Sequence, residues 1–170
     1  GGDGMEVQID NRNPNIVFTG SQFGFYARLD LETGRRKSIK PVHELGNSPY
    51  RFNWQTPILL SPHNQDVLYL GSNFLHKSYN QGDDWKTISE DLTSGGKKGN
   101  VPYGTITTIS ESPLKEGVLY TGSDDGLVYV SKNKGKTWKN ISENLPKELW
   151  VSNVYASNHD EKVVYLSLDG

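Results

Sequence analysis

The sequence predicts an all-β chain made of repeated four-stranded antiparallel units, and three observations lead to this prediction. A similar apolar segment recurs along the chain, twice after 51 residues and then after 45. A turn signal precedes each copy, and strand-like runs lie before and after it. No stretch shows a convincing helical period, because residues 142–149 allow at most one turn and Pro146 interrupts it.

The first strand of each unit is followed by a turn. The predicted first strands are Met5–Ile9, Pro57–Leu60, Thr105–Ile109 and Val151–Ala156. Asn or Ser suits the first position of a turn, and Pro presets φ at the next position. The predicted turns are Asn13-Pro14, Ser61-Pro62, Ser112-Pro113 and, without proline, Asn158-His159.

The recurring apolar segment is the second strand of each unit. Its copies are Ile16–Ser21, Val67–Ser72, Val118–Ser123 and Val163–Ser167. Nearly every position in these copies is apolar, so we expect both faces of the second strand to be buried.

Third and fourth strands complete the unit. A third strand is predicted at Leu127–Val130, and fourth strands at Trp85–Ile88 and Trp138–Ile141. Four-stranded units that repeat every 40–50 residues or so are typical of β-propeller blades. The sequence therefore predicts a single partial β-propeller over residues 1–170, with three blades and the start of a fourth. The approximate repeats are 1–50, 51–102, 103–149 and a truncated 150–170. A β-sandwich with accidental similarity between strands is the alternative.

The predicted repeats change what the length of the chain indicates about its domains. A chain of 170 residues first indicates one complete domain. Propellers close with about 4–8 blades, however, so this chain is short of a ring. We expect a fragment, or a half-propeller that another chain completes. Its partners would be the remaining blades of a longer parent chain, or a second copy associating through exposed strand edges.

Two turns between third and fourth strands share the pattern Ser-x-Asn-x-Gly-x-x-Trp, and we name them the box turns. The Asn oxygen is expected to accept from backbone N–H groups two residues on, and Gly to supply a positive φ. The Trp is expected to pack back on its own blade, with its indole N–H near a backbone acceptor. The residues are Ser78, Asn80, Gly82 and Trp85 in one turn, and Ser131, Asn133, Gly135 and Trp138 in the other.

These turns resemble the Asp-box, or BNR, repeat, whose pattern is Ser-x-Asp-x-Gly-x-x-Trp. Both copies carry Asn where that family usually has Asp, which keeps the acceptor oxygen and weakens any reading as a metal site. A degenerate copy at 28–34 keeps Asp30 and Gly34. The chain is most similar to bacterial BNR-repeat proteins described as sortilin-like or glycosyl-hydrolase-like. The resemblance implies that the box is structural and that it specifies fold better than function.

Strand order divides the loops between two faces. The turns after first and third strands share one face, which we name the box face, and the other connections share the loop face. The resemblance implies that a ligand, a glycan or a peptide, binds at the loop face near the channel mouth. Exposed aromatic side chains with Asp, Asn and Arg nearby can stack on a sugar ring or hold a peptide. The candidate ligand-binding residues are Arg51, Asn53, Trp54, Tyr103, Asp124, Asp125 and Trp150.

A catalytic role is not favoured for this segment. A glycosidase needs two carboxylates about 5–10 Å apart, and Asp3 with Asp124 is the combination that the strand order allows. A sialidase needs three arginines, whereas only Arg51 maps clearly to the loop face. The first hypothesis is therefore a binding module. The alternatives are part of a glycoside hydrolase whose active site is shared with missing blades, and a purely structural interaction module.

Composition excludes several further classes. The 18 basic and 20 acidic residues give no overall attraction to nucleic acid. The chain has no cysteine, and its four histidines lack metal-ligand spacing, so neither a metal nor a cofactor is expected. No apolar run approaches about 20 residues, so membrane insertion is not expected. An extracytoplasmic location, periplasmic or secreted, is implied by the family resemblance alone.

Overall fold

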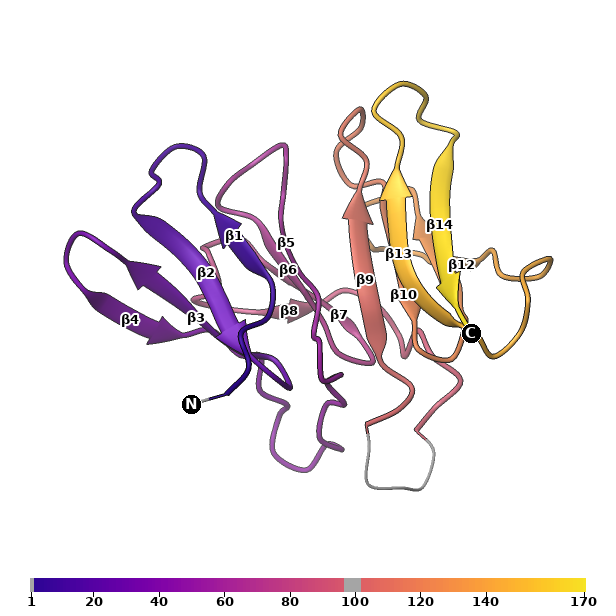
Figure 1. Ribbon diagram of the computed structural model, residues 1–170, viewed down its shortest axis with the longest axis horizontal. Helices are drawn as coiled ribbons and strands as arrows, with labels where there is room; N and C mark the ends of the chain where they lie inside the picture. Colours follow the sequence, from indigo (N-terminus) through magenta and orange to yellow (C-terminus); the bar gives the residue numbers. More distant parts are fainter. Residues whose placement is uncertain (1, 97–101) are drawn as a thin grey trace.

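The computed structural model describes residues 2–96 and 102–170, and in this part of the chain it contains β-strands and no helix (Figure 1). Three sheets have four strands each and a fourth sheet has two, all paired with antiparallel neighbours. Blade 1 is β1 (Val7–Ile9), β2 (Ile16–Ser21), β3 (Phe25–Asp30) and β4 (Arg35–Ser38). Blade 2 is β5 (Ile58–Leu60), β6 (Leu68–Gly71), β7 (Leu75–Ser78) and β8 (Lys86–Thr87). Blade 3 is β9 (Ile106–Glu111), β10 (Leu119–Ser123), β11 (Val128–Ser131) and β12 (Lys139–Asn140). The half-blade is β13 (Trp150–Ala156) and β14 (Val164–Asp169).

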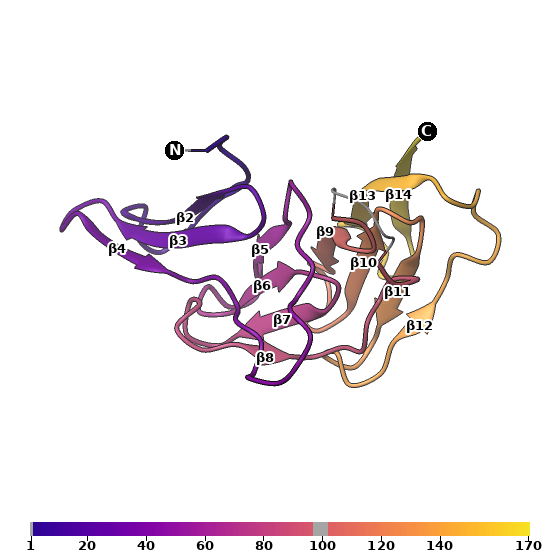
Figure 2. The same cartoon turned by 90° about the horizontal axis from the view of Figure 1, so that it is seen from below.

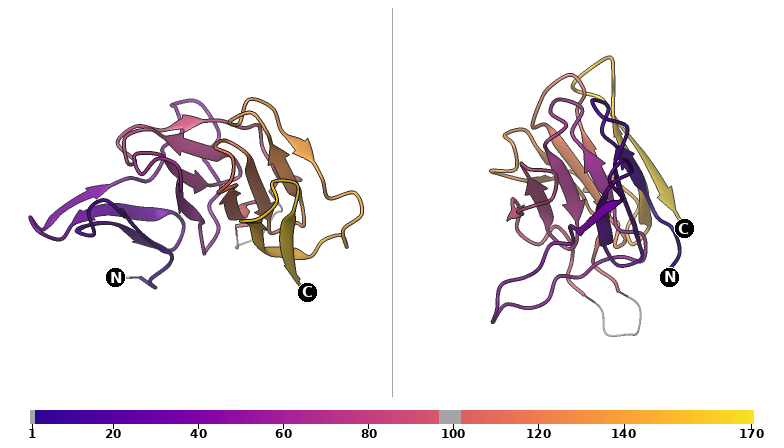
Figure 3. Two further views of the ribbon diagram at one scale, coloured as in Figure 1. Left: turned by 90° about the horizontal axis from the view of Figure 1, so that it is seen from above. Right: turned by 90° about the vertical axis from the view of Figure 1, so that its left-hand side faces the viewer.

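The four sheets fan out in an open arc, with their first strands toward the concave side (Figures 2 and 3). These first strands contact one another in turn, β1 with β5, β5 with β9 and β9 with β13. Both termini and the long connections lie at the loop face, which is the lower end in Figure 1. The all-β, blade-like prediction is therefore confirmed.

Burial of the second strand depends on whether a blade lies on each side. β6 and β10 are buried along their whole length, as the sequence predicts. In β14 exposed residues alternate with partly buried ones, so the prediction of two buried faces is wrong for that strand. The cause is that β14 packs on blade 3 with one face only, where Val164 and Leu166 join a cluster around Tyr120.

A polar seam joins the first strands of blades 1 and 2, and a similar seam joins blade 3 to the half-blade. Glu6 Oε2 accepts from the backbone N–H of Ile58 at 3.2 Å, and Gln8 Oε1 accepts from Leu60 at 3.3 Å. Between blade 3 and the half-blade, Thr108 Oγ1 accepts from Val154 N and Ser110 Oγ from Ala156 N, again two residues apart. Side chains of one first strand therefore satisfy the free edge of the next, which an unpaired edge requires.

The box turns close around the Ser hydroxyl and the Asn amide. Asn80 Oδ1 accepts from Asp84 N at 2.9 Å and from Ser78 Oγ, and Ser78 Oγ in turn accepts from Gly82 N. The same bonds recur in the second box turn. The Asn side-chain oxygen is the acceptor, as predicted. The prediction that its backbone donor lies two residues on is wrong, because the turn places the N–H four residues on opposite the amide oxygen.

Each box turn docks on the preceding blade. Trp85 Nε1 donates to Ile39 O at 2.8 Å, and Trp138 Nε1 donates to Ile88 O at 2.9 Å. Gly82 and Gly135 have φ values of +88° and +84°, as predicted. The expectation that the Trp packs back on its own blade is wrong in one respect, since its indole N–H reaches a carbonyl of the neighbour.

The degenerate copy in blade 1 forms its turn differently. Asp30 Oδ1 accepts from the backbone N–H groups of Glu32 and Thr33, and Gly34 has a φ of +69°. A hydrogen bond from the Thr33 side chain, together with these backbone bonds, holds the pKa of the Asp30 carboxyl below its ordinary value. The Asp30 carboxylate thus accepts the backbone hydrogen bonds of its turn, a role that Ser and Asn share in the box turns. This turn has no Trp that could reach another blade.

Candidate functional site

A hollow of about 440 Å³ opens on the concave side of the arc, where the first strands begin. Five separate segments contribute to it. Four of them lie at the start of a first strand, which begins at the loop face and faces the arc's axis, and the fifth is the end of β14. We name it the channel-mouth hollow. Its lining residues are Glu6, Gln55, Thr107, Thr108, Trp150, Ser152, Asn153 and Asp169.

The channel-mouth hollow combines an aromatic ring with polar groups. The Trp150 side chain begins β13 opposite Asp169 and is 39% exposed. Ser152 Oγ lies 2.9 Å from Ser167 Oγ and donates to Asp169 Oδ1 at 3.2 Å. Asn153 is exposed, so its amide is accessible from this side. Rings, hydroxyls and amides gathered in a concavity are what binding sites for polar organic ligands contain.

Two carboxylates in this hollow differ in environment. Burial raises the pKa of Glu6 above its ordinary value, and the N–H of Ile58 opposes that effect only in part. Asp169 lies at the end of β14 and is exposed. A carboxyl group that keeps its proton can donate a hydrogen bond to a bound ligand.

The structure places three predicted ligand-binding residues inside the protein. Asn53 Nδ2 donates to Asp124 Oδ2 at 3.2 Å, and Asp124 also accepts from the N–H groups of Gly104 and Thr105 and from the Thr105 hydroxyl. Burial is the largest influence on Asp124 and raises its pKa, against the opposing bonds from Thr105. Asp125 is likewise buried and accepts from Ser94 N and Oγ. These side chains hold the loops between blades 2 and 3.

Arg51 also joins loops. Its guanidinium donates to Asp91 Oδ2 at 2.7 Å, to Thr93 Oγ1 and to the carbonyl of Gly104. Asp91 additionally accepts from Asn73 Nδ2, and despite its partial burial these bonds leave its pKa below the ordinary value. The positive charge of Arg51 is therefore directed at a carboxylate of the same chain, that of Asp91.

The remaining candidates lie apart from one another. Trp54 is half-exposed and packs edge-on against Phe23, with ring centroids 5.3 Å apart. Tyr103 is partly buried in the loop that leads to β9. Asp3 accepts from Gln22 Nε2 at 3.3 Å, and in residues 2–96 and 102–170 no hydrogen bond or ion pair joins it to Asp124. Of the seven predicted ligand-binding residues, the channel-mouth hollow includes Trp150 alone.

The sequence reasoning missed the small polar residues of this hollow. Thr107, Thr108, Ser152 and Asn153 are chemically ordinary, and only the arc brings them together. The signal that could have found them is position, since they lie in the opening residues of predicted first strands. Those residues of successive blades converge on a propeller's axis.

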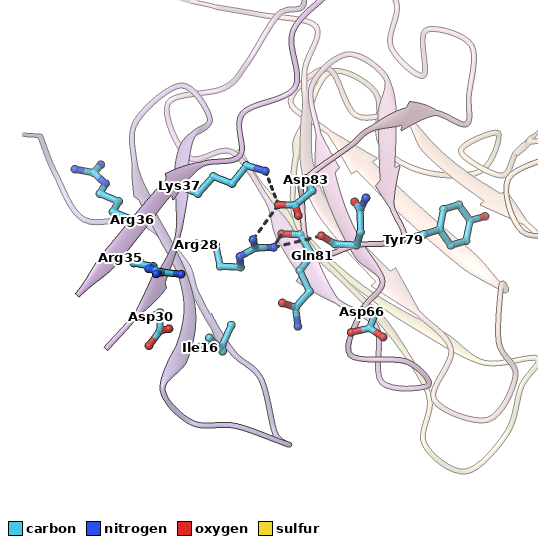
Figure 4. Close-up of a pocket in the computed structure, with 11 residues that line it drawn as sticks. Ile16, Arg28, Asp30, Arg35, Arg36, Lys37, Asp66, Tyr79, Gln81 and Asp83 are labelled. Atoms are coloured by element: carbon cyan, nitrogen blue, oxygen red, sulfur yellow. Dashed lines mark hydrogen bonds and ion pairs between the residues drawn. The ribbon is translucent and has the colours of Figure 1, made fainter. Parts of the chain in front are cut away.

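A larger hollow of about 790 Å³ lies on the box face between blades 1 and 2 (Figure 4). Arg28 and Lys37 both reach Asp83, at 2.9 and 2.7 Å, and Arg28 Nη1 also donates to the carbonyls of Asn80 and Gln81. The two cations hold the pKa of the Asp83 carboxyl below its ordinary value, with the Lys37 bond contributing most. This network joins β3 and β4 to the first box turn, so we assign it to blade packing.

In residues 2–96 and 102–170 no group of three His, Asp or Glu side chains is arranged to hold a metal ion. The same ranges contain no helix long and apolar enough to cross a membrane.

Comparisons with known proteins give information on the fold of the chain. No family model matches the chain. Among curated proteins, it is 28% identical over 104 residues to the vacuolar protein sorting/targeting protein 10 of Emericella nidulans, which covers 61% of this chain and 6% of that protein.

Solved structures agree with the fold over nearly the whole chain. An ancestral GH74 enzyme matches with a TM-score of 0.67 at 17% identity, covering 98% of this chain and 22% of that one. The extracellular domain of the one-component-system protein BT4673 from B. thetaiotaomicron matches at 0.64 and 17%, covering 98% and 20%. YCF48 bound to D1 peptide matches at 0.58 and 14%, covering 92% and 44%. The chain thus has the fold of β-propeller blades, and it spans less than half the length of each of these proteins.

Proposed function

We propose that the chain is part of a ligand-binding β-propeller module of an extracytoplasmic protein, and that the channel-mouth hollow binds a glycan. The single observation that carries this proposal is the exposed indole of Trp150 in a hollow where five segments bring together hydroxyl, amide and carboxylate groups. An aromatic face stacks on the apolar face of a sugar ring, while amides and carboxylates bind its hydroxyl groups. The fold shared with a GH74 enzyme and with the extracellular domain of a one-component-system protein supports the proposal.

The test compares two tryptophans of the same loop face. The protein is screened on a glycan array and against a peptide library, and affinities for hits are measured by calorimetry. Trp150→Ala is expected to weaken glycan binding by about tenfold or more, since interface aromatics dominate binding energy. Trp54→Ala is the matched control, because Trp54 is half-exposed outside the hollow, and it is expected to leave the affinity unchanged.

Three other outcomes would contradict parts of the proposal. Loss of binding in Trp54→Ala with full binding in Trp150→Ala would move the site to the Phe23–Trp54 pair. Binding of peptides without glycans would retain the module and overturn the ligand class. If neither glycans nor peptides bind, the proposal is wrong and the chain is better explained as a purely structural interaction module.

A second candidate function is glycoside hydrolysis, and two carboxyl groups that line the hollow, Glu6 and Asp169, favour it. A raised pKa suits Glu6 to donate a proton to a leaving oxygen, and Asp169 would supply the second carboxylate. If the hollow hydrolyses the glycan that it binds, Glu6→Gln will abolish turnover and keep binding. Turnover that is unchanged in Glu6→Gln would remove this candidate.

A further inference from the structure

The last strand of blade 1 pairs with a neighbour on one side only. The sheet order β1-β2-β3-β4 puts β4 at the edge opposite to β1, and all four residues of β4 are exposed. This edge lies on the outer rim of the arc (Figures 2 and 3). The fourth strands of blades 2 and 3, β8 and β12, have two residues each, so β4 is the longest of the three rim strands.

The rim edge of β4 does not depend on how many blades the arc contains. Blades follow one another by packing sheet face on sheet face, as Phe18 of blade 1 packs in one cluster with Leu60 and Leu70 of blade 2. A further blade beside blade 1 would therefore cover a face of its sheet and leave the outer edge of β4 accessible.

The main chain of β4 presents hydrogen-bonding groups at this edge. Just beyond the strand, Ile39 N donates to Tyr26 O at 3.0 Å. Residues of an antiparallel strand alternate between bonding to their neighbour and facing away from it, so the main-chain groups of Arg36 and Ser38 point away from β3. An edge with N–H and C=O groups at strand spacing is a template for a further strand.

The side chains of β4 give this edge a positive charge. Arg35, Arg36 and Lys37 are consecutive, and Lys37 Nζ lies 2.7 Å from Asp83 Oδ1. In the part of the chain that the structure describes, neither Arg35 nor Arg36 forms an ion pair, although Asp30 lies opposite Arg35 in the register. A partner that follows this edge therefore meets cations without a carboxylate in direct contact.

One side of β4 also lines the hollow of about 790 Å³ between blades 1 and 2 (Figure 4). The register puts Arg35 and Lys37 on the same face of the sheet as Arg28, which lines this hollow as well. Every second side chain of an added strand would point to this side. Carboxylates at those positions would meet Arg35, whose planar guanidinium can bind a carboxylate through two N–H groups.

We infer that the outer edge of blade 1 binds an acidic peptide segment, which pairs with β4 as a fifth strand. The main-chain groups of Arg36 and Ser38 bond to the peptide backbone, and the Arg35 guanidinium binds its carboxylates. Backbone groups at strand spacing select a polypeptide among polyanions, and the consecutive cations select acidic over basic sequences. The site lies at the opposite edge of the sheet from β1 and is separate from the channel-mouth hollow.

Fluorescence anisotropy with a short labelled peptide that alternates Glu and Thr tests this inference. The wild type is expected to bind the peptide, and more weakly at high ionic strength. Ser38→Pro removes one N–H of the free edge without a change of charge, and proline is tolerated where that N–H faces solvent. Its affinity is expected to fall about fivefold, the effect of one hydrogen bond. Arg35→Gln removes the carboxylate partner and is expected to weaken binding by about the same factor.

Two matched variants and a modified peptide serve as controls. Ser38→Ala keeps the N–H and loses only the hydroxyl, so it is expected to bind like the wild type. Lys139→Gln removes an exposed cation from β12, another rim strand, and is also expected to bind like the wild type. A peptide with N-methyl groups on all main-chain amides keeps its carboxylates and loses its donors, so its binding is expected to be lost. This last measurement needs no variant of the protein.

The results that would overturn the inference are equally specific. A wild type that does not bind the acidic peptide would leave the cations of β4 as protection of a free edge against aggregation. Equal binding of polygalacturonate or of the N-methylated peptide would show that charge alone is recognised. Equal affinities of Ser38→Pro and Ser38→Ala, with folding verified by circular dichroism, would show that the edge takes no part.

Discussion

The asparagine of each box turn uses both ends of its amide. The oxygen serves the turn itself, while Asn80 Nδ2 donates to Asp84 Oδ2 at 2.9 Å and Asn133 Nδ2 donates to Thr137 Oγ1 at 2.8 Å. An aspartate keeps the acceptor oxygen and loses this donor. The side chain four residues on therefore decides whether Asp is tolerated in place of Asn.

The two box turns are expected to respond differently to aspartate. Asn80→Asp places a carboxylate against the carboxylate of Asp84 and is expected to lower the unfolding free energy by about 1 kcal/mol, the size of a lost hydrogen bond. Asn133→Asp faces the Thr137 hydroxyl, which can turn and donate, and its effect is expected to be small. Urea denaturation at pH 7 measures both, and Asp84→Thr should rescue Asn80→Asp. Equal losses in the two turns would show that the second amide bond is not what matters.

Box turns act as elements that lock one blade to the one before. The glycine of each turn has a positive φ and lies directly against an isoleucine of the preceding blade. A Cβ on Gly135 would lie 2.7 Å from Ile88 Cδ1 and 3.0 Å from Ile88 O. Gly34, in the degenerate turn, also has a positive φ and would meet nothing within 4 Å. A comparison of Gly34 with Gly135 therefore separates the effect of backbone strain from the effect of lost docking.

Alanine at these two glycines is expected to give unequal losses of stability. Gly34→Ala carries only the strain of a left-handed backbone, about 1–2 kcal/mol. Gly135→Ala adds a clash with the Ile88 backbone, so we expect a total of roughly 3 kcal/mol or more. Chemical denaturation of the two variants measures the difference. Similar losses would contradict the close docking of the box turn on blade 2.

Sequence patterns predicted the strands of these elements better than their contacts. The repeat revealed the strands because apolar runs, Ser-Pro turns and Gly positions are local signals. The contact of Trp138 with Ile88 O is different, because its acceptor is a backbone carbonyl with no sequence signature in another repeat. Likewise, Asp124 looks exposed in a loop sequence, and only folding surrounds it with Asn53 and Thr105.

Across the whole molecule, one buried histidine couples stability to pH. The His76 ring lies between Ser72 Oγ at 2.8 Å from Nε2 and Thr87 Oγ1 at 3.1 Å from Nδ1, with the Tyr50 ring 4.5 Å away. Burial lowers the pKa of His76 from 6.5 to about 4. Between these values the unfolded chain binds a proton that the folded chain excludes, so stability falls as the pH decreases.

This coupling has a measurable size. The unfolding free energy is expected to decrease by roughly 3 kcal/mol from pH 7.5 to pH 4, beyond the contribution of the carboxylates. His76→Gln keeps a side chain that can bond the hydroxyls and removes the proton, so the part of the decrease above pH 5 should disappear. Urea denaturation at several pH values provides the comparison. A parallel pH profile in the variant would contradict the assignment to His76.

The polar seam between first strands ties the packing of the blades to the channel-mouth hollow. Each seam uses the same positions in both partners, donors on one strand and side-chain acceptors on the one before, at Ile58 as at Val154. Glu6 and Thr108 are acceptors of the seam and also line the channel-mouth hollow, so a substitution at either position changes blade packing and the hollow together.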